Sequence, residues 1–203
     1  MTYLLCHGFG FTDDYWKNLI PFLDDKYEFW NEDIQKNSTE SYVGIGHSIG
    51  FLKLNNSIIK FKALVGLQGF LNFCGIDPKQ KIVRIKNLDR MMEACAKDSQ
   101  KFLRFFYKVC GYPERVPHEN SSEKLIADLK MMKLSYPHCG VPTLIIGSHE
   151  DKIVEPSILE DDFGKDRMIK VDYIDGVLHN LGYSMPKETF EMIKNFLKEH
   201  IDG

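Results

Sequence analysis

The chain has 203 residues, a formal net charge of −3, and a composition that is 43% hydrophobic and 12% aromatic. This length fits one domain, and this share of hydrophobic residues is enough to build a buried core, which excludes a disordered tail. The 26 lysines and arginines are balanced by 29 aspartates and glutamates, so the overall charge gives no support for nucleic-acid binding.

The cellular setting is predicted from features that the sequence lacks. The first residues contain no basic segment followed by a long apolar one, as a secretory signal would, and no run approaches the ~18 apolar residues of a membrane-spanning helix. The five cysteines are scattered and form no C-x-x-C pair, so neither a disulfide framework nor a zinc site is indicated. We therefore expect a cytoplasmic protein that neither binds a metal nor enters a membrane.

Six short apolar runs are predicted to form β-strands, at residues 3–6, 27–30, 42–46, 62–67, 143–146 and 168–174. A helix is expected after the first run, with Thr12 as its N-cap and with Pro21 kinking it or shifting its boundaries. A second amphipathic helix is expected near the C-terminus, with Pro186 in its first turn. Strands that alternate with helices predict an α/β fold with a mostly parallel sheet of about six strands and helices on both faces.

Residues 77–134 interrupt this alternation, because they contain no convincing strand and several helical stretches. One apolar helical face is expected after Asp98, and another after Ser121 and Ser122. The members of these two faces are Phe102, Phe105, Phe106 and Val109 in the first, and Leu125, Ile126, Leu129 and Met132 in the second. We interpret residues 77–134 as a helical lid inserted into a core formed by residues 1–76 and 135–203.

The segment at residues 46–50, Gly-His-Ser-Ile-Gly, directly follows the third predicted strand and matches the G-x-S-x-G nucleophile elbow. A very sharp strand-to-helix turn exposes the serine oxygen, and it needs small neighbours so that the backbone can pass closely. The pattern makes Ser48 the candidate nucleophile and aims the amide of Ile49 at a developing oxyanion. An isolated match to this pentapeptide is weak, and its weight comes from the segments around it.

Three further segments complete a catalytic arrangement. Residues 7–10, His-Gly-Phe-Gly, can aim the amide of Phe9 at the same oxyanion, although an ordinary glycine-rich turn is the alternative. Asp151, or Glu150 in its place, follows the fifth strand, where a carboxylate can accept a hydrogen bond from a histidine. His179 lies between the last strand and the final helix, as a general base would. A solvated acidic turn and a structural histidine are the alternatives.

The chain order Ser48, Asp151, His179 is that of the α/β-hydrolases. On these residues the sequence resembles the α/β-hydrolase superfamily over nearly its whole length, and His47 is expected only to pack within the elbow. The resemblance implies an α/β-hydrolase fold and acyl transfer through an acyl-enzyme, which requires no metal or organic cofactor. A non-catalytic binding protein is the alternative from another class, but such a protein has no need of all three groups.

Within the superfamily, the sequence most resembles the BioH-like pimeloyl-acyl carrier protein methyl ester esterases of biotin synthesis. The resemblance rests on residues 7–10 followed by Trp16, on Phe-Leu-Arg-Phe-Phe at 102–106, and on the run at 129–154. It implies hydrolysis of the methyl ester of pimeloyl-acyl carrier protein. The connection after the second strand, with only residues 34–41 available, is shorter than in typical relatives. A general short-chain carboxylesterase or acyl thioesterase of the same fold is the alternative.

The distribution of charge along the chain is compatible with binding of an acidic acyl carrier protein. Residues 77–134 contain 13 lysines and arginines against eight acidic residues, whereas the remainder of the chain is acidic. The side chains expected to contact the carrier or its acyl chain are Arg84, Arg90, Lys101, Arg104, Lys108, Phe102, Phe105 and Phe106. A basic surface steers an acidic partner towards it. The alternatives are a solvated helix face for the charges and lid core for the aromatic rings.

Overall fold

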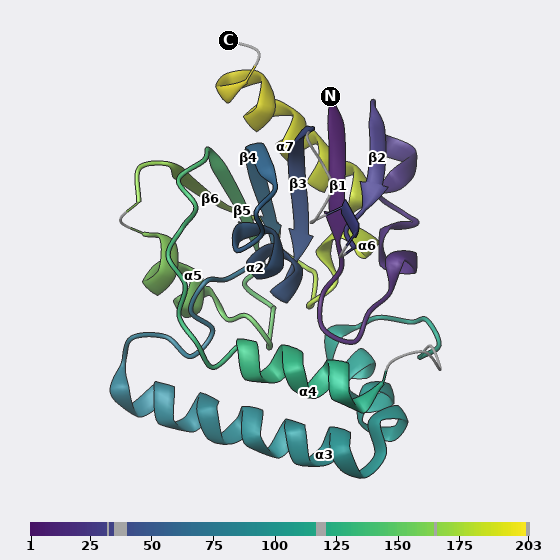
Figure 1. Ribbon diagram of the computed structural model, residues 1–203, viewed down its shortest axis with the longest axis vertical. Helices are drawn as coiled ribbons and strands as arrows, with labels where there is room; N and C mark the ends of the chain where they lie inside the picture. The colour runs from purple at the N-terminus through teal and green to yellow at the C-terminus, as the bar shows by residue number, and fades with distance from the viewer. Residues whose placement is uncertain (32, 35–39, 117–120, 165, 202–203) are drawn as a thin grey trace.

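The computed structural model describes residues 1–31, 33–34, 40–116, 121–164 and 166–201 (Figure 1). The strands are β1 (Thr2–Cys6), β2 (Lys26–Phe29), β3 (Ser41–His47), β4 (Lys60–Leu67), β5 (Thr143–Gly147) and β6 (Ile169–Tyr173). The α-helices are α2 (Ile49–Asn55), α3 (Pro78–Cys110), α4 (Ser122–Met131), α5 (Pro156–Phe163), α6 (Leu181–Ser184) and α7 (Pro186–His200). Two short 3₁₀ turns are η1 (Asp13–Trp16) and η2 (Ile20–Phe22).

The six strands form one sheet in the order β2-β1-β3-β4-β5-β6, and every neighbouring pair is parallel. The predicted parallel sheet is therefore confirmed, and each observed strand overlaps its predicted run. The central strands β3 and β4 end in uninterrupted runs of buried residues, as expected for strands that are covered on both faces. Because all strands are parallel, their carboxyl ends meet at one edge of the sheet, where α/β proteins place their sites.

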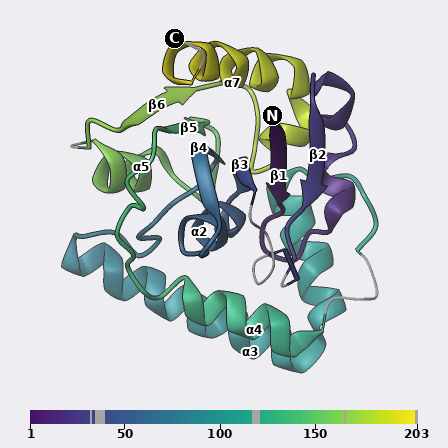
Figure 2. The same cartoon turned by 45° about the horizontal axis from the view of Figure 1, so that its top comes forward.

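Helices cover both faces of the sheet, as predicted (Figure 2). On one face, α2 and α5 meet through the rings of Phe51 and Phe163, which pack edge to face with centroids 6.1 Å apart. On the other face, Phe190 of α7 packs edge to face on Tyr3 of β1 at 6.3 Å. The expected C-terminal helix is thus confirmed, with Pro186 in its first turn. The fully buried side chains between these layers form the core.

The helices α3 and α4 lie side by side across the carboxyl ends of the strands (Figures 1 and 2). Asp77 caps the start of α3 by accepting a hydrogen bond from the amide of Gln80 at 2.8 Å. The helix bends at Asp98, whose φ of −162° is not helical and whose carboxylate accepts from the amide of Lys101 at 2.9 Å. Asp98 therefore caps a second helical segment, which agrees with the sequence. Among the described residues, no helix combines the length and apolar character needed to cross a membrane.

The buried face of the second half of α3 agrees only in part with the prediction. The side chains that it buries are Leu103, Phe106, Tyr107 and Cys110, whereas in the predicted face Phe106 is buried, Phe102 and Val109 are half-buried, and Phe105 is exposed. The buried face depends on contacts with distant residues, which the periodicity of the sequence does not reveal. One such contact is the hydrogen bond from the hydroxyl of Tyr107 to the carbonyl of Gly10, at 2.7 Å. The prediction for α4 was better, since Leu125, Leu129 and Met132 are buried and Ile126 packs partly against the core.

The prediction of a helix that begins after Thr12 is wrong. The chain forms the short turns η1 and η2 instead, and Thr12 makes no side-chain cap hydrogen bond. Pro21 explains the interruption, because it has no amide hydrogen and stands at the start of η2. The apolar residues still reach the core, with Trp16 and Leu19 fully buried. The short connection predicted for residues 34–41 lies mostly outside the described residues.

Candidate active site

Ser48 occupies a sharp turn between β3 and α2. Its φ of 54° and ψ of −126° place a non-glycine residue at positive φ, which costs about 1–3 kcal/mol. The turn requires glycine on both sides. A Cβ atom on Gly46 would lie 2.3 Å from the backbone nitrogen of Phe51, and one on Gly50 would lie 2.1 Å from the carbonyl oxygen of Cys6. The local sequence thus permits a strained turn at Ser48, as the elbow pattern predicts.

Two backbone amides near Ser48 have no acceptor among the described residues. Ile49 is the first residue of α2, so its amide has no partner within the helix. Phe9 lies in the turn after β1, and its amide donates to no residue that the structure describes. The side chain of Phe9 lines the same pocket as Ser48. Both amides can donate to an oxygen bound beside the serine, and their role as an oxyanion hole remains a prediction.

His179 and Asp151 form a buried pair. Nδ1 of His179 lies 2.7 Å from Oδ2 of Asp151, and Nε2 of the same ring is buried without a hydrogen bond to any described residue. An imidazole that donates from Nδ1 keeps its lone pair on Nε2, which is the atom that accepts a proton in a general base. The ring of His179 lies 4.7 Å from that of His47, the residue before Ser48. The structure therefore brings the predicted base next to the elbow.

The carboxylate of Asp151 accepts four hydrogen bonds. Its Oδ1 accepts from the amides of Ile153 and Val154, at 2.8 and 3.1 Å. Its Oδ2 accepts from His179 and from the side-chain amide of Gln68, both at 2.7 Å. An ionised carboxylate is an acceptor at both oxygens, so all four donors are satisfied together. This network fixes the carboxylate on the Nδ1 side of the histidine.

Glu150, the alternative acid, points to other partners. Its Oε2 accepts from the hydroxyl of Ser148 at 3.0 Å and from the amide of Gly176 at 3.0 Å. These contacts brace the turns after β5 and β6 but do not reach the ring of His179. The geometry therefore favours Asp151 over Glu150 as the partner of the histidine.

Gln68 also belongs to the network around Asp151, although it was not predicted from the sequence. Its side chain is fully buried and joins the Asp151 network from the end of β4. The sequence did contain one signal for Gln68. It is a polar residue directly after the buried run of β4, and β4 lies between β3, which leads to Ser48, and β5, which leads to Asp151.

His47 is a buried side chain beside His179. Its ring stacks on Tyr15 with centroids 4.2 Å apart and planes 12° apart, and neither ring nitrogen bonds to a described residue. Burial, followed by the nearby imidazoles of His179 and His7, lowers the pKa of His47 well below its usual range. Its packing within the elbow agrees with the expectation from the sequence.

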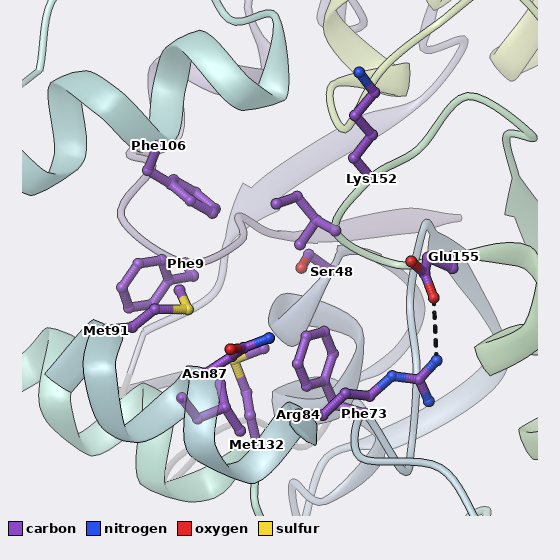
Figure 3. Close-up of a pocket in the computed structure, with 12 residues that line it drawn as sticks. Phe9, Ser48, Phe73, Arg84, Asn87, Met91, Phe106, Met132, Lys152 and Glu155 are labelled. Carbon is purple, nitrogen blue, oxygen red and sulfur yellow. Dashed lines mark hydrogen bonds and ion pairs between the residues drawn. The ribbon is translucent and has the colours of Figure 1, made fainter. Parts of the chain in front are cut away.

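A pocket of about 220 Å³ opens over Ser48, between the edge of the sheet and α3 (Figure 3). Its apolar lining consists of Phe9, Phe73, Leu88, Met91, Phe106, Met132 and Ile153. Its polar lining, besides the serine, consists of Arg84, Asn87, Lys152 and Glu155. A mostly apolar cavity with few polar groups is typical of a small-molecule site. The pocket supplies a place for an acyl group next to the serine oxygen.

The three phenylalanines that were predicted to contact the carrier or its acyl chain have different positions relative to the pocket. Phe106 lines the pocket and packs edge to face on Phe9 at 5.2 Å. Phe102 packs on the same ring at 6.2 Å but is not part of the lining. Phe105 is 66% exposed and also lies outside the lining. Of the three, only Phe106 is placed to contact a bound acyl group.

The predicted basic residues also divide into two groups. Arg90, Lys101, Arg104 and Lys108 are exposed along α3 and form no ion pair with a described residue. Arg84 differs, because its side chain is only 12% exposed and pairs with Glu155 at 3.2 Å. This pair, drawn in Figure 3, ties α3 to the start of α5 at the rim of the pocket. Contacts of any of these residues with a carrier remain a prediction.

The parallel sheet, the strained serine turn and the helices across the strand ends define the α/β-hydrolase fold, as the sequence predicted. An esterase from Exiguobacterium antarcticum has a TM-score of 0.76 at 13% identity, over 98% of this chain and 92% of the esterase. A bromoperoxidase from Bacillus anthracis has a TM-score of 0.75 at 16% identity, over 97% and 91% of the two chains.

A lipase-esterase related protein from Clostridium acetobutylicum ATCC 824 has a TM-score of 0.71 at 17% identity, over 96% of this chain and 93% of that one. The sequence matches no protein-family model and no curated protein. At these identities the structural likeness establishes the fold, so the reaction must be argued from the site.

Proposed function

We propose that the protein is a serine carboxylesterase that hydrolyses esters of small acyl groups. The observation that carries this proposal is the combination of Ser48 at a strained, glycine-flanked turn with a buried His179–Asp151 pair beside it. A ligand-binding protein needs neither the backbone strain nor a buried carboxylate–imidazole pair. Strain of this kind persists where the surrounding structure and a function hold it in place.

The proposed reaction gives each of these groups one role. The Ser48 hydroxyl attacks the ester carbonyl while Nε2 of His179 takes its proton, and the Asp151 carboxylate stabilises the imidazolium that results. The amides of Phe9 and Ile49 hold the oxyanion. The imidazolium then returns the proton to the leaving alcohol, and an acyl-enzyme remains on Ser48. Water, deprotonated by His179, attacks the acyl-enzyme and releases the carboxylic acid and the serine.

The size of the pocket supports a small acyl group. Its volume of about 220 Å³ lies below the ~300–1,000 Å³ of pockets that bind drug-sized ligands. Its lining is mostly apolar, which suits a hydrocarbon chain. These properties support the general short-chain carboxylesterase among the alternatives.

Labelling with a fluorophosphonate tests the reaction. Wild-type protein should be labelled on Ser48, and the Ser48→Ala variant should not. The labelled protein should also lose its activity on p-nitrophenyl acetate. A folded wild-type sample that shows neither labelling nor hydrolysis of p-nitrophenyl esters would contradict the proposal. A series of esters from acetate to octanoate then measures the preferred chain length.

The second candidate substrate is the methyl ester of pimeloyl-acyl carrier protein. The exposed cations of α3, Arg90, Lys101, Arg104 and Lys108, favour this candidate because they can attract an acidic carrier. The charge-reversal variant Arg104→Glu/Lys108→Glu tests it. Its turnover of the carrier-linked ester should fall at least tenfold, and its turnover of p-nitrophenyl acetate should not change.

Lys60→Glu/Lys62→Glu is the matched control for this experiment, because it changes the net charge equally at exposed positions of β4, away from α3. Equal rates on the carrier-linked ester in the two double variants would show that α3 does not dock the carrier. Comparing the oxygen ester with the corresponding thioester separates a carboxylesterase from an acyl thioesterase.

A further inference from the structure

We propose that Gln68 is a positioning residue that holds the carboxylate of Asp151 and the loop carrying His179 in their reactive arrangement. This inference rests on the proposed function and adds to it a residue outside the serine, histidine and acid. Gln68 follows the last residue of β4 and is completely buried. It does not line the pocket, and its side chain bonds to Asp151, Leu178 and Leu181, so any effect on the reaction is exerted through these groups.

The side-chain amide of Gln68 binds three partners. Its Nε2 donates to Oδ2 of Asp151 at 2.7 Å and to the carbonyl oxygen of Leu178 at 2.7 Å. Its Oε1 accepts from the amide of Leu181 at 3.0 Å. Leu178 and Leu181 flank His179 in the chain. One amide group therefore fixes the backbone on both sides of the histidine and also the carboxylate that the histidine bonds to.

These partners leave one orientation for the amide. Rotating it by half a turn would set Oε1 against the carboxylate of Asp151 and the carbonyl of Leu178, both of which are acceptors. It would also set the NH₂ group against the amide hydrogen of Leu181, which is a donor. The pattern of donors and acceptors thus matches glutamine and no ionised side chain. A carboxylate at this position would repel Asp151 and lose both bonds that Nε2 donates.

The backbone of Gln68 is held in a strained conformation. Its φ is 53°, in the region that favours glycine, and among the described non-glycine residues only Ser48 shares a positive φ. The amide of Gln68 donates to Ile146 of β5 at 2.8 Å, and the carbonyl of Leu67 accepts from Ser48 at 2.9 Å. Residues 67 and 68 therefore join the nucleophile turn to the strand that leads to the acid. Strain at such a junction indicates a position kept for function.

The chemical consequence concerns the step in which His179 becomes charged. The Gln68 donor shares Oδ2 with the imidazole, so it both aims the carboxylate and withdraws part of its negative charge. Without this donor, the carboxylate can rotate away from the ring, and the His179 loop loses two anchors. Misplacement of a catalytic group by about 1 Å costs up to ~100-fold in rate. The loss should appear in kcat and not in KM, since the pocket is unchanged.

The first test compares Gln68→Met with wild type on p-nitrophenyl acetate. Methionine has a similar length but no hydrogen-bonding amide. Rates are expressed per active site, with the active fraction titrated by a fluorophosphonate, so that unfolded protein does not count. We expect kcat to fall ~10- to 100-fold with KM within about twofold of wild type. An unchanged kcat per active site would overturn the proposal.

The matched control is Asn55→Leu. Asn55 is another buried amide that bridges two segments, donating to Pro137 at 2.9 Å and accepting from the amide of Cys139 at 3.0 Å. It lies at the end of α2, away from the acid and the base. Its loss should lower the melting temperature but leave kcat per active site unchanged. An equal fall of kcat in both variants would show that Gln68 has only a structural role.

One further readout separates positioning from packing. In an Asp151→Asn background, Gln68→Met should lower kcat much less than in wild type, because residues that act as a unit are not additive. Additive losses in the double variant would overturn the proposal. Failure of wild type to label or to turn over esters would instead contradict the proposed function.

Discussion

Nδ1 of His179 lies 2.7 Å from Oδ2 of Asp151, and the two side chains are 1% and 0% exposed. Burial at this level keeps water from competing for the hydrogen bond. The carboxylate also accepts three other hydrogen bonds, so its orientation does not depend on the histidine alone. The pair therefore sets the tautomer of the histidine before any substrate binds.

Replacing Asp151 by asparagine should lower kcat on p-nitrophenyl acetate by roughly 10⁴-fold, because an amide allows the wrong imidazole tautomer. The fold should survive, because asparagine has the same shape. Glu150→Gln is the matched control: Glu150 is the neighbouring acid, but it bonds to Ser148 and Gly176. Steady-state kinetics of both variants check this prediction. A larger loss in Glu150→Gln would assign the role to Glu150.

The glycines of the serine turn give a second prediction. Gly50→Ala should prevent folding or lower the melting temperature strongly, since its Cβ would lie 2.1 Å from a backbone oxygen that cannot move aside. Gly140→Ala is the control, because a Cβ at that position has no neighbour within 4 Å and adds only the cost of its positive φ, about 1 kcal/mol. Thermal unfolding of the two variants measures the difference. Equal melting temperatures would show that the turn relaxes around the extra methyl group.

The sequence predicted the sheet and the serine turn because local patterns determine both. Apolar runs with turn residues between them identified all six strands, and the glycines on each side of Ser48 report a backbone constraint at that point. The partners of the acid were not predictable in the same way. Gln68 reaches Asp151 across 83 positions in the chain, and one polar residue after a buried strand has no periodicity that reveals it.

The segment at residues 77–134 shows the same limit of prediction from sequence. Its helices and the cap at Asp98 follow from local sequence, but the face that α3 buries is chosen by distant groups such as Gly10. Of the two adjacent phenylalanines on the predicted face, Phe106 lines the pocket as expected, whereas Phe105 lies in solvent. Periodicity gives the width of an apolar face more reliably than its direction.

The burial of His47 leads to a prediction of how the stability of the fold depends on pH. Its pKa in the folded protein is lowered by burial, whereas in the unfolded chain it has the ordinary value near 6.5. The unfolded state therefore binds more protons as the pH falls below ~6.5, and the folded state loses stability there. Above that pH the contribution is fully present. Each such histidine adds a slope of up to ~1.4 kcal/mol per pH unit to the free energy of unfolding.

The variant His47→Phe removes this titration and keeps an aromatic ring against Tyr15. Urea unfolding between pH 5 and 6.5 should show a smaller dependence of the unfolding free energy on pH than in wild type. His149→Gln is the control, because His149 is exposed and its bond to Asp175 raises its pKa, which affects stability only at higher pH. A pH dependence unchanged in His47→Phe would mean that His47 does not stay neutral in the fold.

Phe106 and Phe105 provide adjacent positions for testing the pocket. Phe106→Ala should open the cavity above Ser48, because its ring lines the pocket, whereas Phe105→Ala removes a ring that is 66% exposed. We expect the ratio of kcat/KM for p-nitrophenyl octanoate to that for acetate to rise at least tenfold in Phe106→Ala. The same ratio should be unchanged in Phe105→Ala. Loss of the buried ring costs about 3–5 kcal/mol of stability, so Phe106→Leu serves as a milder second variant. If the ratio stays at the wild-type value in both Phe106 variants, the acyl group binds elsewhere.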